Sequence, residues 1–253
     1  MKPLTSSEKK MYFGMLRASA SRVLARLQLT SERVTKFGFC DEAELDAALE
    51  KLVSRFSAIG VNEDTAREIM GQNFFGGAEC ERHFGVKLGE IPAIPFTTDD
   101  FAATRETHVL VFVPPLSIEE IRAKHSQFFS AKNDVWYANE KFAANKPDAW
   151  SWHLVRKTLV SHSTSKSWSE QQALLGDRDI IPTGRVLVYT IIGHFLKTGE
   201  RLFEKIYVRT SDLDSFGFRV RVGGFDSGGL YVSHDWDGYR YDGLGVASSR
   251  KFN

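Results

Sequence analysis

The segment DSFGFRVRVGGFDSGGLYVSH (residues 214–234) decides the fold class that we predict. It holds the pattern Asp-Ser-x-Gly twice, twelve residues apart, and each copy is followed by an apolar residue, any residue and Val. Asp starts turns by accepting backbone N–H bonds, and Gly adopts the positive φ that tight turns need. Because this spacing equals one strand plus one turn, the segment predicts an antiparallel β-meander.

The sequence on both sides of this segment predicts further strands. KIYVR (205–209) and LGVAS (244–248) are short β segments that extend the meander at each end. Earlier in the chain, the continuous apolar run HVLVFV (108–113) predicts a buried strand, and WHLVRKTLV (152–160) predicts another.

Helices are predicted mainly in the first part of the chain. Residues 185–196 are ambiguous by periodicity, because a β-branched run favours a strand while Pro182 and Gly199 favour a helix. We predict a helix there. Apolar spacing predicts the other helices at 6–28, 41–57 and 62–70, and capping boxes predict helices that begin after Ser117 and Ser167.

This order of elements, with helices first and strands last, predicts an α+β fold. We expect a mainly helical region over residues 1–90. An α+β region over 91–253 follows and ends in the antiparallel meander. One continuous domain is the alternative, since 253 residues can form a single large core.

Composition is that of a globular protein and excludes several classes of function. The formal net charge of +1 provides no overall field that would attract nucleic acid or a membrane. The longest apolar stretch (186–196) is about half the length needed to span a bilayer, and no secretory signal is visible. Cys40 and Cys80 lie far apart, which suits free thiols in a reducing compartment. We therefore expect a cytoplasmic protein without a membrane span.

Charge is nevertheless distributed unevenly. Residues 1–36 hold eight Lys or Arg and two acidic residues, while 37–107 hold six basic and fourteen acidic residues. A basic N-terminal helix could contact nucleic acid. The alternative is that this helix packs beside the acidic segment of its own chain. We favour the alternative and do not expect nucleic acid as a partner.

Aspartates in the predicted turns raise the question of a metal site. Asp212, Asp214 and Gly217 match three positions of a calcium-binding loop, but the position of the bidentate Glu is Gly223. Asp212 and Asp214 could still form an irregular calcium site with Asp226, because hairpin turns at one end of a sheet come close together. Turn formation alone explains these aspartates, so we expect no cofactor and keep calcium as the alternative.

Aromatic residues and acids are interleaved near the C-terminus. Trp236, Tyr239 and Tyr241 lie among Asp235 and Asp237, a combination that suits stacking and hydrogen bonding to a ligand. If this segment is a strand, Tyr239 and Tyr241 lie side by side on one face. Our leading expectation is therefore a non-enzymatic binding module that uses this surface for an unknown protein or carbohydrate.

A hydrolase-type enzyme is the competing hypothesis. No Walker A motif, HExxH motif or histidine pair at i, i+4 is present. A site would have to be assembled from residues distant in sequence, which would bring a histidine within hydrogen-bond reach of a carboxylate. The candidate residues are His162, Ser163, Lys166, Asp212, Asp214 and His234.

Four stretches of the chain have a distinctive amino-acid sequence. They are MGQNFFGG (70–77), IPAIPFTTDDF (91–101), WHLVRKTLVSHSTSKSWSEQQALL (152–175) and VYTIIGHFLKTGERLFEKIYVRTSDLDSFGFRVRVGGFDSGGLYV (188–232). In these stretches the chain resembles a family of bacterial hypothetical proteins. The resemblance implies a bacterial setting and one concerted unit, and it implies no activity, cofactor or site.

Overall fold

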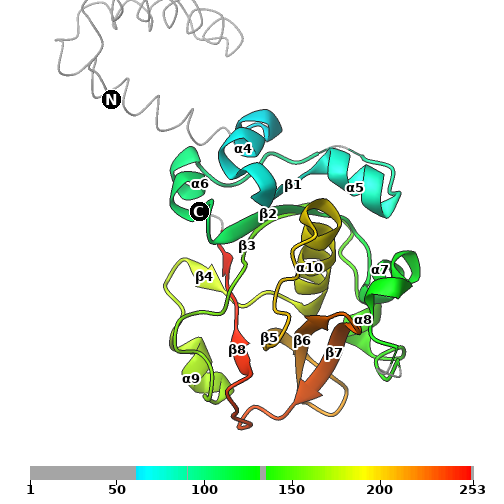
Figure 1. The fold of residues 1–253 in the computed structure, drawn as a ribbon, viewed down its shortest axis with the longest axis vertical. Coiled ribbons are helices and arrows are strands. Elements are labelled where there is room, and N and C mark those ends of the chain that lie inside the picture. Colours follow the sequence, from blue (N-terminus) through cyan, green and yellow to red (C-terminus); the bar gives the residue numbers. More distant parts are fainter. Residues whose placement is uncertain (1–60, 90, 132–134, 252–253) are drawn as a thin grey trace, which may run out of the picture. The chain divides into compact units, whose positions relative to one another are not determined.

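A computed structural model describes residues 61–89, 91–131 and 135–251 of the chain. These residues belong to the unit Ser57–Asn253. The helices predicted at 6–28 and 41–57, including the basic N-terminal helix, lie outside the described residues. Two mixed sheets and the described helices establish a mixed α+β class (Figure 1).

The first sheet is buried on both faces along its strand β2. Its strand order is β1-β2-β3-β9-β4, with β1 parallel to β2 and the other pairs antiparallel. Val109 and Val111 of β2 belong to one hydrophobic cluster, while Leu110 and Phe112 belong to the other. This two-sided burial explains the continuous apolar run in the sequence. The strands are β1 Phe74–Phe75, β2 His108–Val113, β3 Ser151–Arg156, β4 Asp179–Ile180 and β9 Ser249–Arg250.

Strand β1 lies in the first expected region (1–90) and β2 lies in the second (91–253). Their pairing therefore joins residues of both ranges in one sheet. The strand predicted at 108–113 is confirmed as β2. The strand predicted at 152–160 is confirmed in its first part only, because β3 ends at Arg156.

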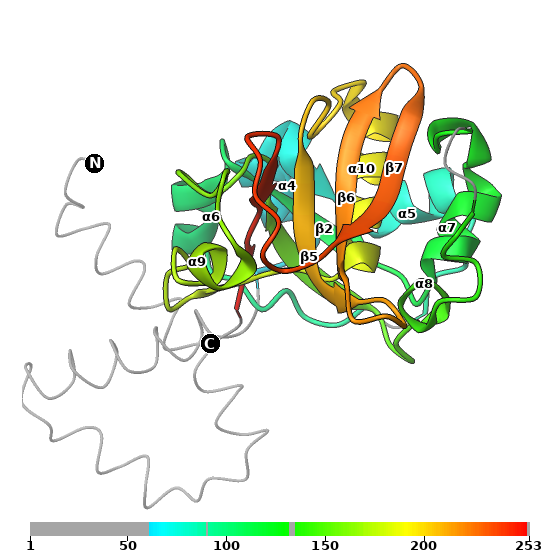
Figure 2. The ribbon, with the colours of Figure 1, turned by 90° about the horizontal axis from the view of Figure 1, so that it is seen from below.

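The second sheet has the order β7-β6-β5-β8 (Figure 2). Strand β6 is antiparallel to β5 and to β7, whereas β8 is parallel to β5. The expectation that LGVAS (244–248) continues an antiparallel meander is therefore wrong for the last strand. Its direction follows from the connection 236–243, which returns across the sheet to place Leu244 beside Tyr207. The strands are β5 Tyr207–Leu213, β6 Arg219–Asp226, β7 Gly229–Asp235 and β8 Leu244–Val246.

Helix α10 (Gly184–Thr198) lies between the two sheets and packs against β2 and β6 (Figure 1). The helix predicted at 185–196 is thus confirmed. It begins where the Thr183 side chain accepts the backbone N–H of Val186 and ends at Gly199, which has φ 77°. Because α10 is buried on several sides, its sequence lacks a single apolar stripe, and this explains its ambiguous periodicity.

The remaining helices are short, and several of them begin at capping residues. Ser117 and Ser167 form the predicted capping boxes with Glu120 and Glu170, and Asn62 caps the predicted helix at 62–70. Among the described helices, none combines the length and hydropathy that crossing a bilayer requires. These helices are α4 Glu63–Met70, α5 Gly77–Phe84, α6 Thr98–Thr104, α7 Ile118–Lys124, α8 Lys141–Ala144 and α9 Trp168–Gln172, with 3₁₀ turns at Gly71–Asn73 and Ser126–Phe128.

Candidate functional site

The connection 236–243 covers the face of the second sheet that points away from α10. Arg209 of β5 lies on this face and is fully buried beneath the connection. Burial lowers the pKa of Arg209, and the nearby carboxylates of Asp235 and Asp237 oppose this shift. Its guanidinium donates to the carbonyl oxygens of Lys166 (3.1 Å), Trp236 (3.4 Å) and Tyr239 and to Oε1 of Gln171 (2.9 Å). Arg209 therefore anchors the connection to the sheet.

Two further arginines on this face pair with the acids of the segment. Arg219 donates through Nε and one terminal nitrogen to both carboxylate oxygens of Asp237, each at 3.1 Å. Arg221 lies 2.8 Å from Asp235 in an ion pair whose atoms are not aligned as a hydrogen bond. The Arg219 guanidinium also lies 4.0 Å from the ring centre of Trp168. The negative charge of Asp235 and Asp237 is therefore matched within the protein.

The aromatic rings of the connection are held in place by close packing on glycines. Residues 236–243 form turns rather than the strand considered from sequence, yet the rings of Tyr239 and Tyr241 are adjacent, with centres 5.7 Å apart. The Trp236 ring lies against Gly238, and the Tyr241 ring lies against Gly243, where a Cβ atom would collide with each ring. Trp236 is 59% exposed and Tyr239 is 40% exposed, while Tyr241 is half-buried.

Exposed apolar side chains also occur at the β5–β6 hairpin, next to the end of β7 from which the connection starts. Phe216, at the tip of the β5–β6 hairpin, is 80% exposed, and Leu213 and Phe218 are also exposed. The ring of Phe218 lies edge-on to His234 at the end of β7, 5.4 Å between centres. We group the exposed apolar residues of the hairpin and of the connection under the name interaction surface, which consists of Leu213, Phe216, Phe218, Trp236 and Tyr239.

Asp214 and His234 form a hydrogen-bonded pair beside this surface. The Asp214 side chain is fully buried, and its Oδ1 accepts the backbone N–H groups of Phe216 and Phe218 at 2.9 Å each. Its Oδ2 contacts Nδ1 of His234. Burial raises the pKa of Asp214, but the hydrogen bonds from His234 and the two amides outweigh burial and hold this pKa below its usual range. The half-exposed His234 ring lies 4.4 Å from the Trp136 ring.

The other candidates for a hydrolytic site lie apart from this pair. His162 is exposed on a turn with φ 61°, and Ser163 is buried with its hydroxyl accepting a backbone N–H. Lys166 contributes its carbonyl oxygen to the Arg209 network. Within residues 61–89, 91–131 and 135–251, no hydrogen bond or ion pair joins these three residues to Asp214 or His234.

The three candidate calcium ligands have separate structural partners. Asp212 accepts the backbone N–H of Gly184 at 2.7 Å and so caps α10, and burial raises its pKa. Asp226 accepts the N–H of Gly228 at 2.7 Å in the β6–β7 turn. Asp214 binds His234 as described above. In the part of the chain that the structure describes, no three His, Cys, Asp or Glu side chains are grouped so that they could hold a metal ion.

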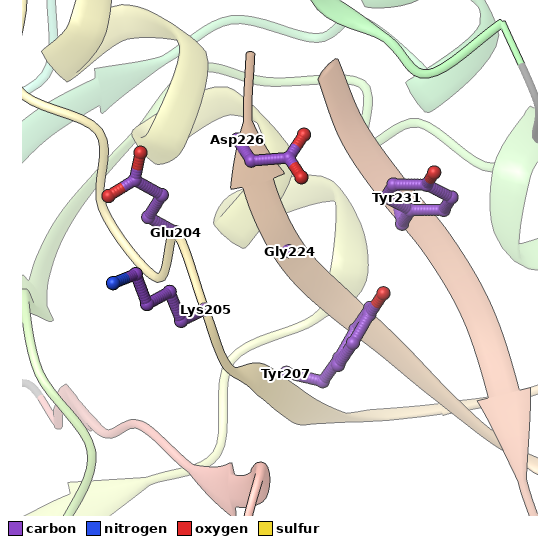
Figure 3. A pocket seen from close by; sticks show the side chains of 6 residues that line it. All are labelled: Glu204, Lys205, Tyr207, Gly224, Asp226 and Tyr231. Atoms are coloured by element: carbon purple, nitrogen blue, oxygen red, sulfur yellow. The ribbon is translucent and has the colours of Figure 1, made fainter. Parts of the chain in front are cut away.

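A hollow of about 390 Å³ opens beside β5, β6 and β7 (Figure 3). Tyr207 and Tyr231 form its aromatic walls, with ring centres 6.4 Å apart and planes inclined by 71°. We call it the tyrosine hollow, and it is lined by Glu204, Lys205, Tyr207, Gly224, Asp226 and Tyr231.

Sequence reasoning missed Arg209 and the two hollow tyrosines. An Arg within the apolar segment KIYVR was a signal for an unusual environment, since an isolated cation in a buried strand needs partners. Tyr207 and Tyr231 share a face because both oppose Gly223 in the register of the sheet. Comparison with known proteins adds no residue to this set, because no protein-family model, curated protein or solved structure matches the chain.

Proposed function

We propose that the protein is a non-enzymatic, cytoplasmic bacterial binding module that contacts a protein partner through the interaction surface. The observation that carries this proposal is the concentration of exposed apolar side chains. Of the nine large hydrophobic residues exposed among the described residues, five belong to the interaction surface. Exposed aromatic groups clustered at one place are typical of protein contact sites.

The support beneath the surface favours binding. Arg209 fixes the backbone at Trp236 and Tyr239, and Gly238 lets the Trp236 ring lie close to the loop. Asp214 fixes the tip that carries Phe216 by accepting two of its backbone N–H groups. A surface that is already ordered loses less conformational entropy when a partner binds.

A protein fits these residues better than a carbohydrate does. A sugar needs an aromatic ring with free hydrogen-bonding groups around it, but Asp235 and Asp237 are already engaged by arginines. The exposed apolar side chains also include Phe216 of the hairpin in addition to Trp236, more than one sugar ring would require. Carbohydrate therefore remains the second ligand class.

The test compares two surface variants of the full chain. Phe216→Ser combined with Trp236→Ala removes the two most exposed rings, and Ile180→Ser removes an apolar side chain of 43% exposure elsewhere. Immobilised proteins are exposed to a bacterial extract and, separately, to an oligosaccharide array. We expect a protein that is retained by the wild type and by Ile180→Ser and is lost from the double variant.

Two results would contradict this proposal. Equal retention of all proteins by the double variant would remove the interaction surface as the contact site. Binding of an oligosaccharide that depends on Trp236, without any protein that depends on it, would replace the protein partner by a carbohydrate.

The hydrolase hypothesis stays a second candidate because one observation favours it. Asp214 orients His234 with Nδ1 engaged, an arrangement that could leave Nε2 to accept a proton from water. Hydrolysis of p-nitrophenyl esters and phosphates, measured for wild type and His234→Gln, tests it. A rate that falls to background in the variant would favour an enzyme, and identical rates would exclude this pair as its catalytic centre.

A further inference from the structure

The tyrosine hollow differs from the interaction surface in its chemistry. It is lined mainly by polar and charged groups, and its walls are phenol rings rather than exposed alkyl or indole groups (Figure 3). The Arg221 guanidinium lies 4.3 Å from the centre of the Tyr207 ring and so supports one side of it. Arg221 also pairs with Asp235, and this ion pair holds the guanidinium in place against the Tyr207 ring.

The hollow depends on a glycine at its base. Gly224 has φ 58°, and a Cβ atom there would lie 2.8 Å from the hydroxyl of Tyr207. A residue with a side chain would therefore strain the backbone and push the Tyr207 ring aside. The backbone of Asp226 is held by Arg201, which donates to its carbonyl oxygen at 2.7 Å. The space is thus set by backbone conformation and by neighbouring contacts.

Charge distinguishes the hollow from the remainder of this sheet face. Glu204 and Asp226 form no ion pair among the described residues, and Asp226 has only the N–H of Gly228 as a partner for its carboxylate. In contrast, Asp235 and Asp237 are paired with arginines. Lys205 is the single cation lining the hollow, and Figure 3 shows its side chain extending away from the two rings. Among the lining side chains two carboxylates therefore stand against one ammonium, while the Arg201 guanidinium lies on the carbonyl oxygen of Asp226 and that of Arg221 is paired with Asp235.

We propose that the tyrosine hollow binds a primary ammonium group carried on an aliphatic stem. The carboxylates of Glu204 and Asp226 attract the ammonium, and the rings of Tyr207 and Tyr231 contact its methylene groups and stabilise its charge. A phosphate or carboxylate ligand would be repelled by the same two carboxylates. A free amine and a lysine side chain of a polypeptide share this chemistry.

The first experiment is calorimetric titration of the full chain with n-butylammonium, with n-butanol as the uncharged probe of equal length. We expect saturable binding of the ammonium and none of the alcohol. Glu204→Gln and Asp226→Asn should each weaken binding about three- to fivefold, the scale of an exposed charge contact. Lys205→Gln should strengthen it about twofold. Glu68→Gln, an exposed carboxylate on α4, is the matched control and should change nothing.

Several outcomes would overturn the proposal. They are equal binding of the alcohol, weaker ammonium binding in Lys205→Gln, or unchanged binding in both acid variants. Thermal unfolding of each variant checks that the fold is intact. Tyr231→Leu, which removes one aromatic wall of the hollow, should also weaken ammonium binding. Trp236→Ala should leave ammonium affinity unchanged, so this site and the proposed protein contact can fail separately.

A second titration distinguishes the two sources of the ammonium group. The probe is Nα-acetyl-lysine N-methylamide, which carries the same stem on a blocked backbone. Tighter binding than n-butylammonium would support the site with a polypeptide lysine as its ligand. Equal binding would support the site with a free amine, and no binding of either probe would overturn it.

Discussion

A fully buried guanidinium needs acceptors for its N–H groups. At Arg209 the connection that covers the sheet supplies two of them, the carbonyl oxygens of Trp236 and Tyr239, while Lys166 and Gln171 supply the other two and Nε has no partner among the described residues. In the part of the chain that the structure describes, no carboxylate is bonded directly to Arg209, and its partners are carbonyl and amide oxygens. Hydrogen bonds from the Arg209 side chain therefore join the second sheet to the connection 236–243. Its removal would leave several buried acceptors without donors.

Arg209→Met should lower the free energy of unfolding by roughly 2–4 kcal/mol, because the carbonyl oxygens of Trp236 and Tyr239 lose their donor. Urea unfolding measures this change. Arg240→Met is the control, since Arg240 is half-exposed and pairs with Glu170 at the surface. It should change the free energy of unfolding by less than about 1 kcal/mol. Equal losses in the two variants would contradict the anchoring role of Arg209.

At this scale the sequence predicts residue types better than their partners. The sequence marks Asp235 and Asp237 as candidate ligand-binding residues. The arginines that pair with them come from β6, and this pairing depends on how 236–243 crosses the sheet. Asp212 was grouped with possible metal ligands, yet it caps a helix that begins at Gly184, 28 residues earlier. Such contacts follow from the tertiary fold and not from local spacing.

Helix α10 receives a cap from a different element. Its first backbone N–H groups need acceptors, and Asp212 of β5 provides one for Gly184 at 2.7 Å. This contact ties the helix N-terminus to the second sheet. The carboxylate also lies at the positive end of the helix dipole.

Asp212→Ala should destabilise the protein by about 1–2 kcal/mol, the usual effect of losing a helix cap. Asp212→Asn keeps an acceptor oxygen and should lose less. Thermal unfolding of both variants, with Asp242→Ala as an exposed control, measures the difference. A loss for Asp242→Ala as large as that for Asp212→Ala would argue against the capping role.

Glu79 of α5 links three helices. It forms a two-pronged contact with Arg67 of α4 and lies 3.5 Å from Lys197 of α10. Burial raises the pKa of Glu79, but Arg67, the N–H of Gly76 and Lys197 outweigh burial and lower this pKa to about 2. The folded state therefore holds the carboxylate charged at a pH where the unfolded chain is protonated.

This shift makes the stability depend on pH in one direction. Because the pKa is lower in the folded state, Glu79 stabilises the fold above the unfolded value of about 4.5 and loses this contribution as the pH falls towards 2. Above the unfolded value the full contribution amounts to roughly 3 kcal/mol, and it is lost progressively as the pH falls from 4.5 to about 2. Glu79→Gln should be less stable at pH 7 and should lose less stability on acidification. Urea unfolding at pH 7 and pH 3 measures both, and parallel pH profiles for the two proteins would contradict the assignment.

At the scale of elements, local sequence signals predict where a helix or strand lies and which of the two it is. The direction of a strand in its sheet depends on the connection that leads to it. Pro182 and Gly199 were sufficient to favour a helix at 185–196 against the β-branched run. The parallel direction of β8 was missed, because a short Gly-rich connection suggests a hairpin. Here the connection instead crosses the sheet, where Arg209 holds it.

The whole unit is organised around α10, which contacts both sheets (Figure 1). Its Tyr189 ring lies 5.8 Å from the ring of Phe75 in β1, and its Phe195 ring lies 5.1 Å from that of Phe225 in β6. Neither sheet can lose its helix without exposing apolar surface. The two sheets should therefore unfold together.

Tyr189→Ala tests this coupling, because it removes a fully buried ring on the side of the first sheet. We expect a loss of about 3–5 kcal/mol in the free energy of unfolding, as for other large buried aromatic residues. Hydrogen exchange of backbone amides in β2 and in β6 shows in which strands the protection against exchange decreases. If α10 couples the sheets, protection falls by the same free energy in both strands, including β6 on the far side of the helix. A loss confined to β2 would mean that the sheets open independently and that α10 belongs energetically to the first sheet alone.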